Sequence, residues 1–255
     1  MRVVFSLLLI WAVLLRPQNL SFEVATIKPT PPDDRSGRFA TMRSARQFVA
    51  KSYTLKYMVA AAYTLPVRAI SGGPDWTNSD RYDITALTPG ESTPTTDQQM
   101  AMLRSLLADR FKLQVHTEPK EQAVYELTAN RTALNLKEST AAPNEQPILV
   151  NRIFPNRVVL PARNATMAEF AAMMGRAVLD RVVVDKTGLS GRYDFDLEWT
   201  PDDTQFGGGL PPIALENIQR PDLFAAVQQL GLKLESTRAK VDIVVIDSVE
   251  RPTPN

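Results

Sequence analysis

The chain has 255 residues, 44% of them hydrophobic and 22% charged, which is typical of a globular protein. Its 29 Lys and Arg nearly balance its 28 Asp and Glu, and no basic stripe with interleaved aromatic residues appears, so nucleic acid is not expected as a partner. Cysteine is absent and His116 is the single histidine, which excludes disulfides, thiol catalysis, thiolate metal sites and a site with two imidazoles from one chain.

The N-terminal segment predicts export. Arg2 precedes thirteen residues, 3–15, of which only Ser6 is not apolar, and Arg16 and Pro17 end the run. Thirteen helical residues span about 20 Å, short of the ~30 Å hydrocarbon core of a bilayer. We therefore expect residues 1–21 to be a signal segment and the protein to be secreted or periplasmic. An A-x-A-like cleavage site is missing, so an uncleaved signal acting as an anchor stays open, and no other membrane span is expected.

Hydrophobic periodicity and turn residues predict the elements of the first half. In chain order these are strands 22–28 and 37–42, a helix 55–63 with Thr54 as N-cap, a turn 71–74, a strand 82–86, a helix 97–109, and strands 112–118 and 124–129 paired as a hairpin. The second helix carries overlapping capping-box signals, Thr95 with Gln98 and Thr96 with Gln99.

Polar, small and proline residues over 131–147 predict a linker, after which the pattern returns. We expect a helix 167–178 capped by Thr166 and Glu169, a strand 182–185, a glycine turn 186–191, a strand 193–199, a helix at about 221–230 with Pro221 in its first turn, and strands 233–235 and 242–247.

The two halves share their order of elements and several landmarks. Thr54 aligns with Thr166, Arg81-Tyr82-Asp83 with Arg192-Tyr193-Asp194, Lys112-Leu113 with Lys233-Leu234, and Val124 with Val241. We predict an internally duplicated α+β fold, each half running helix, strand, helix, strand, strand with a mainly antiparallel sheet. The predicted divisions are a first repeat 22–130, the linker 131–147 and a second repeat 148–255.

Three carboxylates form the first candidate site. Asp194, Asp196 and Glu198 alternate with apolar residues along the predicted strand 193–199, so they share its polar face about 6.6 Å apart in succession. They could hold Ca²⁺ or act as an acid/base pair on a glycan. The alternation of the strand is also sufficient by itself to explain the three carboxylates. They would then form a solvated strand face whose negative charges discourage edge-to-edge pairing with other strands. No metal site is assigned.

Aromatic and arginine side chains near the Arg-Tyr-Asp strands are further ligand-binding candidates. Trp76 and Trp199 could stack on a sugar or peptide, although Trp199 continues an apolar strand face and is expected in the core, while Trp76 could lie either way. Arg81 and Arg192 are expected to pair with a neighbouring carboxylate. His116 is expected on the polar face of its strand, where it needs no catalytic role.

Six stretches carry a resemblance to a known family. They are residues 22–29 (FEVATIKP), 70–76 (ISGGPDW), 107–113 (LADRFKL), 184–195 (VDKTGLSGRYDF), 230–235 (LGLKLE) and 245–252 (VIDSVERP). Together they resemble the "soil-associated" family of exported bacterial proteins with a domain of unknown function, which implies an envelope or secreted location and brings no catalytic residues. The pattern around 223–234 is more weakly similar to the short N-terminal modules of secretins and TonB-dependent receptors, which implies an interaction module.

These observations favour an exported binding or interaction module without a cofactor, whose partner is an envelope or secreted protein or an extracellular polymer. No reaction is assigned. The alternative is a carboxylate- or metal-dependent hydrolase of extracellular glycans or peptides that uses Asp194, Asp196 and Glu198.

Overall fold

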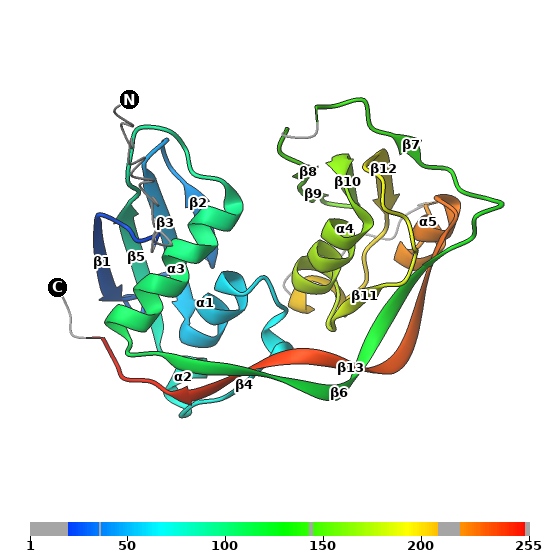
Figure 1. The fold of residues 1–255 in the computed structure, drawn as a ribbon. Coiled ribbons are helices and arrows are strands. Elements are labelled where there is room, and N and C mark those ends of the chain that lie inside the picture. Colours follow the sequence, from blue (N-terminus) through cyan, green and yellow to red (C-terminus); the bar gives the residue numbers. More distant parts are fainter. Residues whose placement is uncertain (1–19, 36, 143–144, 209–219, 253–255) are drawn as a thin grey trace, which may run out of the picture.

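The chain folds into two lobes that stand side by side on a long ribbon of two strands (Figure 1). The computed structural model describes residues 20–35, 37–142, 145–208 and 220–252. Residues 1–19, which hold most of the predicted signal segment, lie outside them. The mixture of helices with mainly antiparallel sheets confirms the α+β class.

The N-lobe is built on a sheet of four antiparallel strands. In sheet order these are β1 (Val24–Pro29), β5 (Arg81–Leu87), β3 (Gln47–Thr54) and β2 (Phe39–Met42). Helices α1 (Leu55–Ala62) and α3 (Thr96–Arg110) pack on it, burying Met58, Leu107 and Ile84 in one core. The short elements η1 (Val67–Ala69), β4 (Ile70–Gly72) and α2 (Trp76–Ser79) connect α1 to β5.

The C-lobe is built on a second antiparallel sheet. Its strands are β7 (Lys137–Glu138), β12 (Tyr193–Trp199), β10 (Arg157–Ala165) and β8 (Ile148–Leu149), with β9 (Arg152–Phe154) also on β10. The remaining elements are α4 (Met167–Met173), its π-helical continuation η2 (Met174–Val178), β11 (Val183–Asp185), η3 (Gln205–Gly208) and α5 (Leu223–Gln229). Tyr193, Phe195, Leu197 and Trp199 are buried, which confirms the predicted alternation of β12.

The ribbon consists of β6 (Gln114–Ala129) and β13 (Leu232–Ser248), paired antiparallel from Leu232 opposite Ala129 to Ser248 opposite Gln114. At the C-lobe end, β11 joins β6 in parallel; at the N-lobe end, β4 joins β13 in parallel. Gly72 permits the latter approach, because a Cβ there would lie 2.6 Å from the Ile246 carbonyl oxygen.

Both ribbon strands run from one core into the other. Leu127 of β6 and Leu232 and Leu234 of β13 lie in the C-lobe core. At the opposite end Val244 and Ile246 of β13 lie in the N-lobe core, with Val115 of β6 packed against it. Each lobe therefore completes its core with residues from both strands.

The hairpin predicted for 112–118 with 124–129 is wrong, because both segments belong to the one continuous strand β6. The separate strands predicted at 233–235 and 242–247 likewise form one strand, β13. The polar residues that predicted the breaks, such as Lys120, Glu121 and Lys240, lie mid-ribbon and are exposed. In this region the two strands pair with each other, so their backbone N–H and C=O groups form hydrogen bonds even though neither strand has an apolar face.

The predicted helix starts are mostly confirmed. Thr95 with Gln98 and Thr166 with Glu169 form complete capping boxes. Thr54 occupies the N-cap position of α1, but its side chain makes no capping hydrogen bond. The placement of Pro221 in the first turn of α5 is wrong. That helix begins at Leu223, and the Asp222 carboxylate accepts the Ala225 amide at 2.8 Å.

The same order of elements leads through each lobe into the ribbon. In the N-lobe the order is β3, α1, β4, β5, α3 and β6; in the C-lobe it is β10, α4, β11, β12, α5 and β13. In both lobes the strand before the helix carries a register shift, between Ala50 and Tyr53 and between Ala162 and Ala165. The predicted limits at 22–130, 131–147 and 148–255 stay predictions.

We expect Ile246→Ala to lower the free energy of unfolding by about 2–4 kcal/mol, because it leaves a cavity where β13 enters the N-lobe core. Ile246 is 4% exposed, whereas Ile153 on β9 is 51% exposed, so Ile153→Ala is the matched control and should cost less than about 0.5 kcal/mol. Urea unfolding measures both. Equal costs would contradict the role of the ribbon in the N-lobe core.

Candidate functional site

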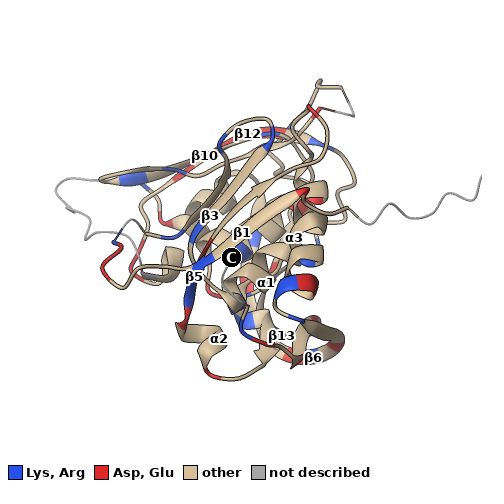
Figure 2. Ribbon diagram, turned by 90° about the vertical axis from the view of Figure 1, so that its left-hand side faces the viewer, with Lys and Arg blue, Asp and Glu red and all other residues tan. Residues whose placement is uncertain are grey.

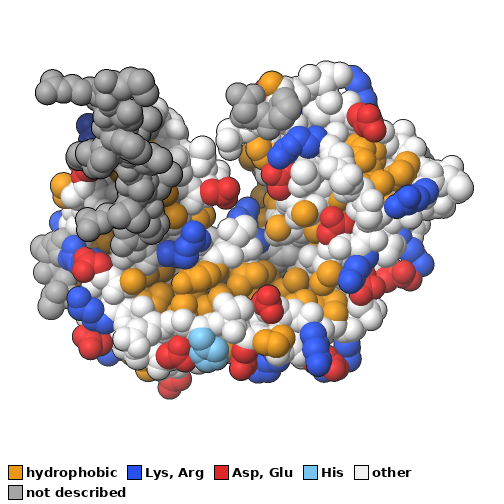
Figure 3. All heavy atoms as spheres, viewed as in Figure 1, with side chains coloured by type: hydrophobic (Ala, Val, Ile, Leu, Met, Phe, Trp, Pro, Cys, Tyr) orange, Lys and Arg blue, Asp and Glu red, His pale blue; other side chains and the backbone are white. Residues whose placement is uncertain are grey.

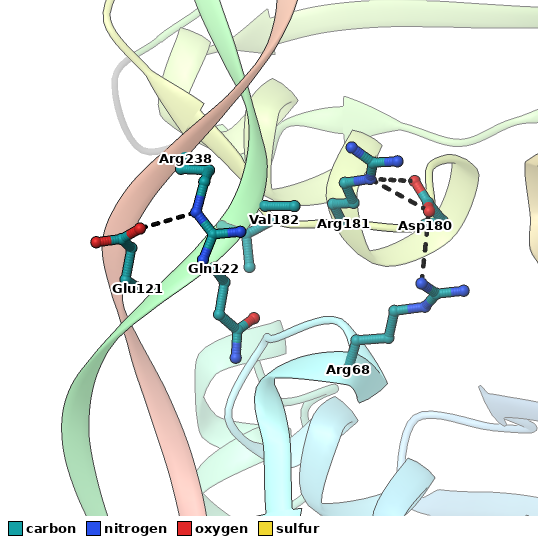
Figure 4. A pocket seen from close by; sticks show the side chains of 8 residues that line it. Arg68, Glu121, Gln122, Asp180, Arg181, Val182 and Arg238 are labelled. Carbon is teal, nitrogen blue, oxygen red and sulfur yellow. Dashed lines mark hydrogen bonds and ion pairs between the residues drawn. The ribbon is translucent and has the colours of Figure 1, made fainter.

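The candidate site is a cavity of about 470 Å³ where the two lobes meet the ribbon, which we call the interlobe pocket. It is lined by Arg68 of η1, residues 121–123 of β6, residues 180–182 before β11, and Arg238 of β13. Figure 4 shows open space between Gln122 and Arg238 on one side and Arg68 on the other. Groups far apart in the sequence thus surround one volume.

Charged side chains dominate the pocket and are partly paired. Arg238 Nε lies 2.8 Å from Glu121 Oε1 across the ribbon. Arg181 Nε lies 3.2 Å from Asp180 Oδ1, and Arg68 Nη1 reaches the other oxygen of that carboxylate at 3.5 Å. Since Arg68 belongs to the N-lobe and Asp180 to the C-lobe, this contact joins the lobes directly.

Arg181 is held in place by the ribbon. Its Nη1 donates to Ser236 Oγ of β13 at 3.0 Å, and its guanidinium carbon lies 5.1 Å from the ring centroid of Tyr125 of β6. The hydroxyl and the aromatic face fix the guanidinium on two sides. Arg181 therefore has its position on one side of the pocket set by contacts with the ribbon.

A second cavity, of about 350 Å³, lies on the outer face of the N-lobe sheet. Its charged lining residues are Lys28, Lys51 and Asp83. Lys51 forms an ion pair with Asp83, and the Thr30 hydroxyl donates to Asp83 Oδ1 at 2.8 Å. Neither cavity is lined by Asp194, Asp196 or Glu198.

The aspartates of the two Arg-Tyr-Asp strands make the same contact in each lobe. Asp83 Oδ1 accepts the Ser52 amide at 3.0 Å, and Asp194 Oδ1 accepts the Asn164 amide at 2.8 Å. Ser52 and Asn164 lie at the register shifts and have φ of 58° and 51°. This conformation is unfavourable for a residue with a side chain, so each carboxylate holds a strained bulge in the neighbouring strand.

These hydrogen bonds set the acidity of both carboxylates. Burial opposes ionisation of Asp83, but hydrogen bonds from Lys51, the Ser52 amide and Thr30 together lower its pKa. The Asn164 amide is the main cause of the lowered pKa of Asp194, against a smaller burial effect. Both groups are therefore anionic at neutral pH.

The other two carboxylates of β12 face solvent and pair with arginines. Arg163 Nη2 contacts both oxygens of Asp196, at 2.9 and 3.1 Å. Glu198 Oε1 lies 2.7 Å from Arg220 Nε and 3.5 Å from Arg157 Nε. The predicted common face of the three carboxylates is correct, and their observed contacts are with the protein itself.

The two predicted arginines contact the bulges. Arg192 Nη1 donates to the Asn164 carbonyl at 2.6 Å and lies 3.3 Å from Glu169 Oε2, as predicted for a carboxylate partner. Arg81 Nη1 instead donates to the Ser52 hydroxyl at 3.0 Å. Both side chains thus reinforce the strained residue that the neighbouring aspartate holds.

The two predicted tryptophans differ in exposure. Trp199 is fully buried, as expected, and its Nε1 donates to Gln205 Oε1 at 2.7 Å. Trp76 is half-buried against the N-lobe core, with the Arg251 guanidinium 5.0 Å from its ring centroid. The structure places neither at a cavity described above.

His116 lies exposed on the ribbon, as expected, with Nδ1 at 2.7 Å from Asp247 Oδ1.

Among the described residues, no group of three or more His, Asp or Glu could hold a metal ion. Within the same residues, no helix is long and apolar enough to cross a membrane. Figure 2 shows Lys and Arg interspersed with Asp and Glu, with no region of a single sign dominating this side of the molecule.

A family model described as "Protein of unknown function (DUF3738)" matches residues 56–249, well over half of the chain. The chain belongs to this family. No curated protein and no solved structure matches it. The span that defines DUF3738 starts inside α1 and ends just after β13, so it includes both ribbon strands and every residue that lines the interlobe pocket.

The pocket residues were not predicted from the sequence of this DUF3738 chain. Arg68, Glu121, Asp180 and Arg238 come from four separate segments. The ribbon pairing brings Glu121 and Arg238 together, and the parallel pairing of β4 and β11 with the ribbon brings the segments that carry Arg68 and Asp180 to them. One signal was present: Arg68 and Asp180 both lie in the short connection after the first helix of their half.

We expect Asp83→Asn and Asp194→Asn each to lower the free energy of unfolding by about 1–2 kcal/mol, because the strained bulge loses a charged acceptor. Asp196→Asn is the matched control, since the Asp196 side chain is 61% exposed and its ion pair should contribute less than about 1 kcal/mol. Urea unfolding at pH 7 measures all three. Similar losses at the three positions would contradict a special role for the bulge contacts.

The same carboxylates predict acid sensitivity. Both pKa values are lowered from 3.8, so the unfolded chain takes up protons first as the pH falls. Their stabilising contribution is complete well above pH 4 and is lost as the pH falls through the folded pKa values. We expect stability measured between pH 6 and about pH 3 to fall less steeply in the double variant Asp83→Asn/Asp194→Asn than in the unmodified protein.

Proposed function

We propose that this protein is a binding module that takes its ligand in the interlobe pocket. The observation that carries the proposal is the convergence of both lobes and both ribbon strands on one cavity of about 470 Å³. A ligand there would contact η1 of the N-lobe, the connection before β11 in the C-lobe, and the ribbon between them. Cavities of this size suit a small molecule or a few residues of a peptide.

The lining supports recognition by charge and hydrogen bonding. It combines three arginines with two carboxylates, one amide and two small apolar residues. The hydrolase alternative gains no comparable support, because Asp194, Asp196 and Glu198 are engaged by a backbone amide or by arginines and lie away from both cavities.

We further propose that the module is exported and acts in the cell envelope or outside the cell. The apolar run at 3–15 after Arg2 and the resemblance to the "soil-associated" exported proteins support this. The partner would then be an envelope or secreted protein, or an extracellular polymer.

Internal duplication is our proposal for the origin of the fold. It is supported by the shared order of elements, by β4 and β11 each joining a ribbon strand in parallel, and by the bulges at Ser52 and Asn164 with their aspartates. The short modules of secretins and TonB-dependent receptors remain a weaker analogy for each half.

Binding in the pocket is tested by a thermal-shift screen of the purified protein against peptidoglycan fragments, oligosaccharides, short peptides, Ca²⁺ and Zn²⁺. A ligand at 100 times its Kd should stabilise the protein by about 2.7 kcal/mol. We expect Ala123→Trp, which fills the pocket, to abolish the shift, and Ala40→Trp, at an exposed position of β2, to preserve it. A shift that survives Ala123→Trp would place the ligand elsewhere.

Export is tested by expressing the full chain in a bacterium and fractionating the cells. We expect the protein in the periplasm or medium, and a variant without residues 2–16 in the cytoplasm. Recovery of the unmodified chain in the cytoplasm would contradict export. N-terminal sequencing of the exported product distinguishes a cleaved signal from a retained anchor.

A further inference from the structure

We infer that the interlobe pocket recognises a carboxylate group of its ligand, with Arg68 and Arg238 as the direct contacts. This inference rests on the proposed function and names the ligand chemistry that the same site would take. The evidence is the charge of the lining, the unused donors of its arginines and the position of the acids that accompany them.

The lining carries one positive charge in excess. Three arginines face two carboxylates, Glu121 and Asp180, within a chain whose overall charge is nearly balanced. A monoanionic carboxylate would neutralise this excess. A phosphate dianion would leave the pocket negative beside two acids, which favours the carboxylate.

The arginines keep donors available. Each guanidinium has five N–H groups. In the described part of the chain, Arg238 contacts Glu121 through Nε, so neither Nη is used in that ion pair. Arg68 contacts Asp180 through Nη1 alone, at a distance long for a hydrogen bond. The side chains of Arg68 and Arg238 are 69% and 66% exposed, so a ligand can reach them.

Arg181 differs from the other two. Its Nε and Nη1 are engaged by Asp180 and Ser236, and its side chain is only 32% exposed. We therefore assign it to positioning Asp180. Figure 4 shows Arg68 and Arg238 on opposite sides of the open space, with the Gln122 side chain, which can donate and accept, on the same side as Arg238. A carboxylate next to an amide group, as at the end of a peptide, fits this set of partners.

The contact between Arg68 and Asp180 can be exchanged for a contact with the ligand. An exposed pair at 3.5 Å contributes little to stability. The ligand carboxylate can therefore take Arg68 as a partner at low cost. Asp180 remains paired with Arg181 at 3.2 Å.

The test compares N-acetyl-dialanine as the free acid with the same dipeptide as its C-terminal amide, by calorimetric titration of the purified full chain. We expect the acid to bind at least tenfold more tightly than the amide. Arg238→Gln should remove this difference. Arg163→Gln is the matched control, because Arg163 pairs with Asp196 on the outer face of the C-lobe, and should preserve it. Glu121→Gln should tighten binding of the acid, because it removes a competing negative charge.

The outcomes separate this inference from the proposed function. Equal binding of acid and amide, both lost in Ala123→Trp, would overturn the carboxylate contact and leave the pocket as the binding site. Inorganic phosphate binding more tightly than the acid, and depending on Arg238, would overturn the carboxylate in favour of a phosphate. Binding of the acid unaffected by Ala123→Trp would overturn both. Absence of binding by the acid would overturn the carboxylate inference, and the wider ligand screen would still test the pocket.

Discussion

The pairing of β6 with β13 is the interaction on which the rest of the structure depends. The lobes have separate sheets and separate cores, yet each core is completed by residues from both ribbon strands. Between the lobes the ribbon is polar and exposed, so its backbone ladder holds it together there while its two ends are anchored by burial. Figure 3 shows hydrophobic side chains in a band across the middle of the molecule, with charged groups of both signs around it.

The same constraint creates the interlobe pocket. Mid-ribbon residues need not be apolar, so charged residues such as Glu121 and Arg238 can occupy these positions and line the pocket. The lobes then bring Arg68 and Asp180 to that site from connections that follow equivalent helices. A pocket built this way depends on how the two lobes are held, because its walls belong to different cores. Binding of the proposed ligand would therefore be coupled to the arrangement of the lobes in this DUF3738 protein.

Local features of the fold could be predicted from the sequence, and features set by distant pairing could not. The alternation of 193–199 and the capping box at Thr166 depend on neighbours in the chain, and both were predicted correctly. The two ribbon strands were predicted as four shorter strands, of which the first two formed a hairpin, because a strand with two exposed faces has no apolar alternation to reveal it. The role of Asp194 was also missed. The alternating sequence around Asp194 indicated a solvated carboxylate. In the structure, Asp194 Oδ1 accepts a hydrogen bond from the backbone amide of Asn164, a bulge residue thirty positions away.

The ribbon also has a consequence for the order in which the protein can fold during synthesis. The N-lobe core needs Val244 and Ile246, which are synthesised more than a hundred residues after the other buried residues of that core. Until they arrive, β4 lacks its partner strand and β6 lacks the ladder that covers its whole length. Such long-range pairing slows folding. An N-terminal half that emerges first would therefore stay incomplete until β13 follows, and the two lobes would close together.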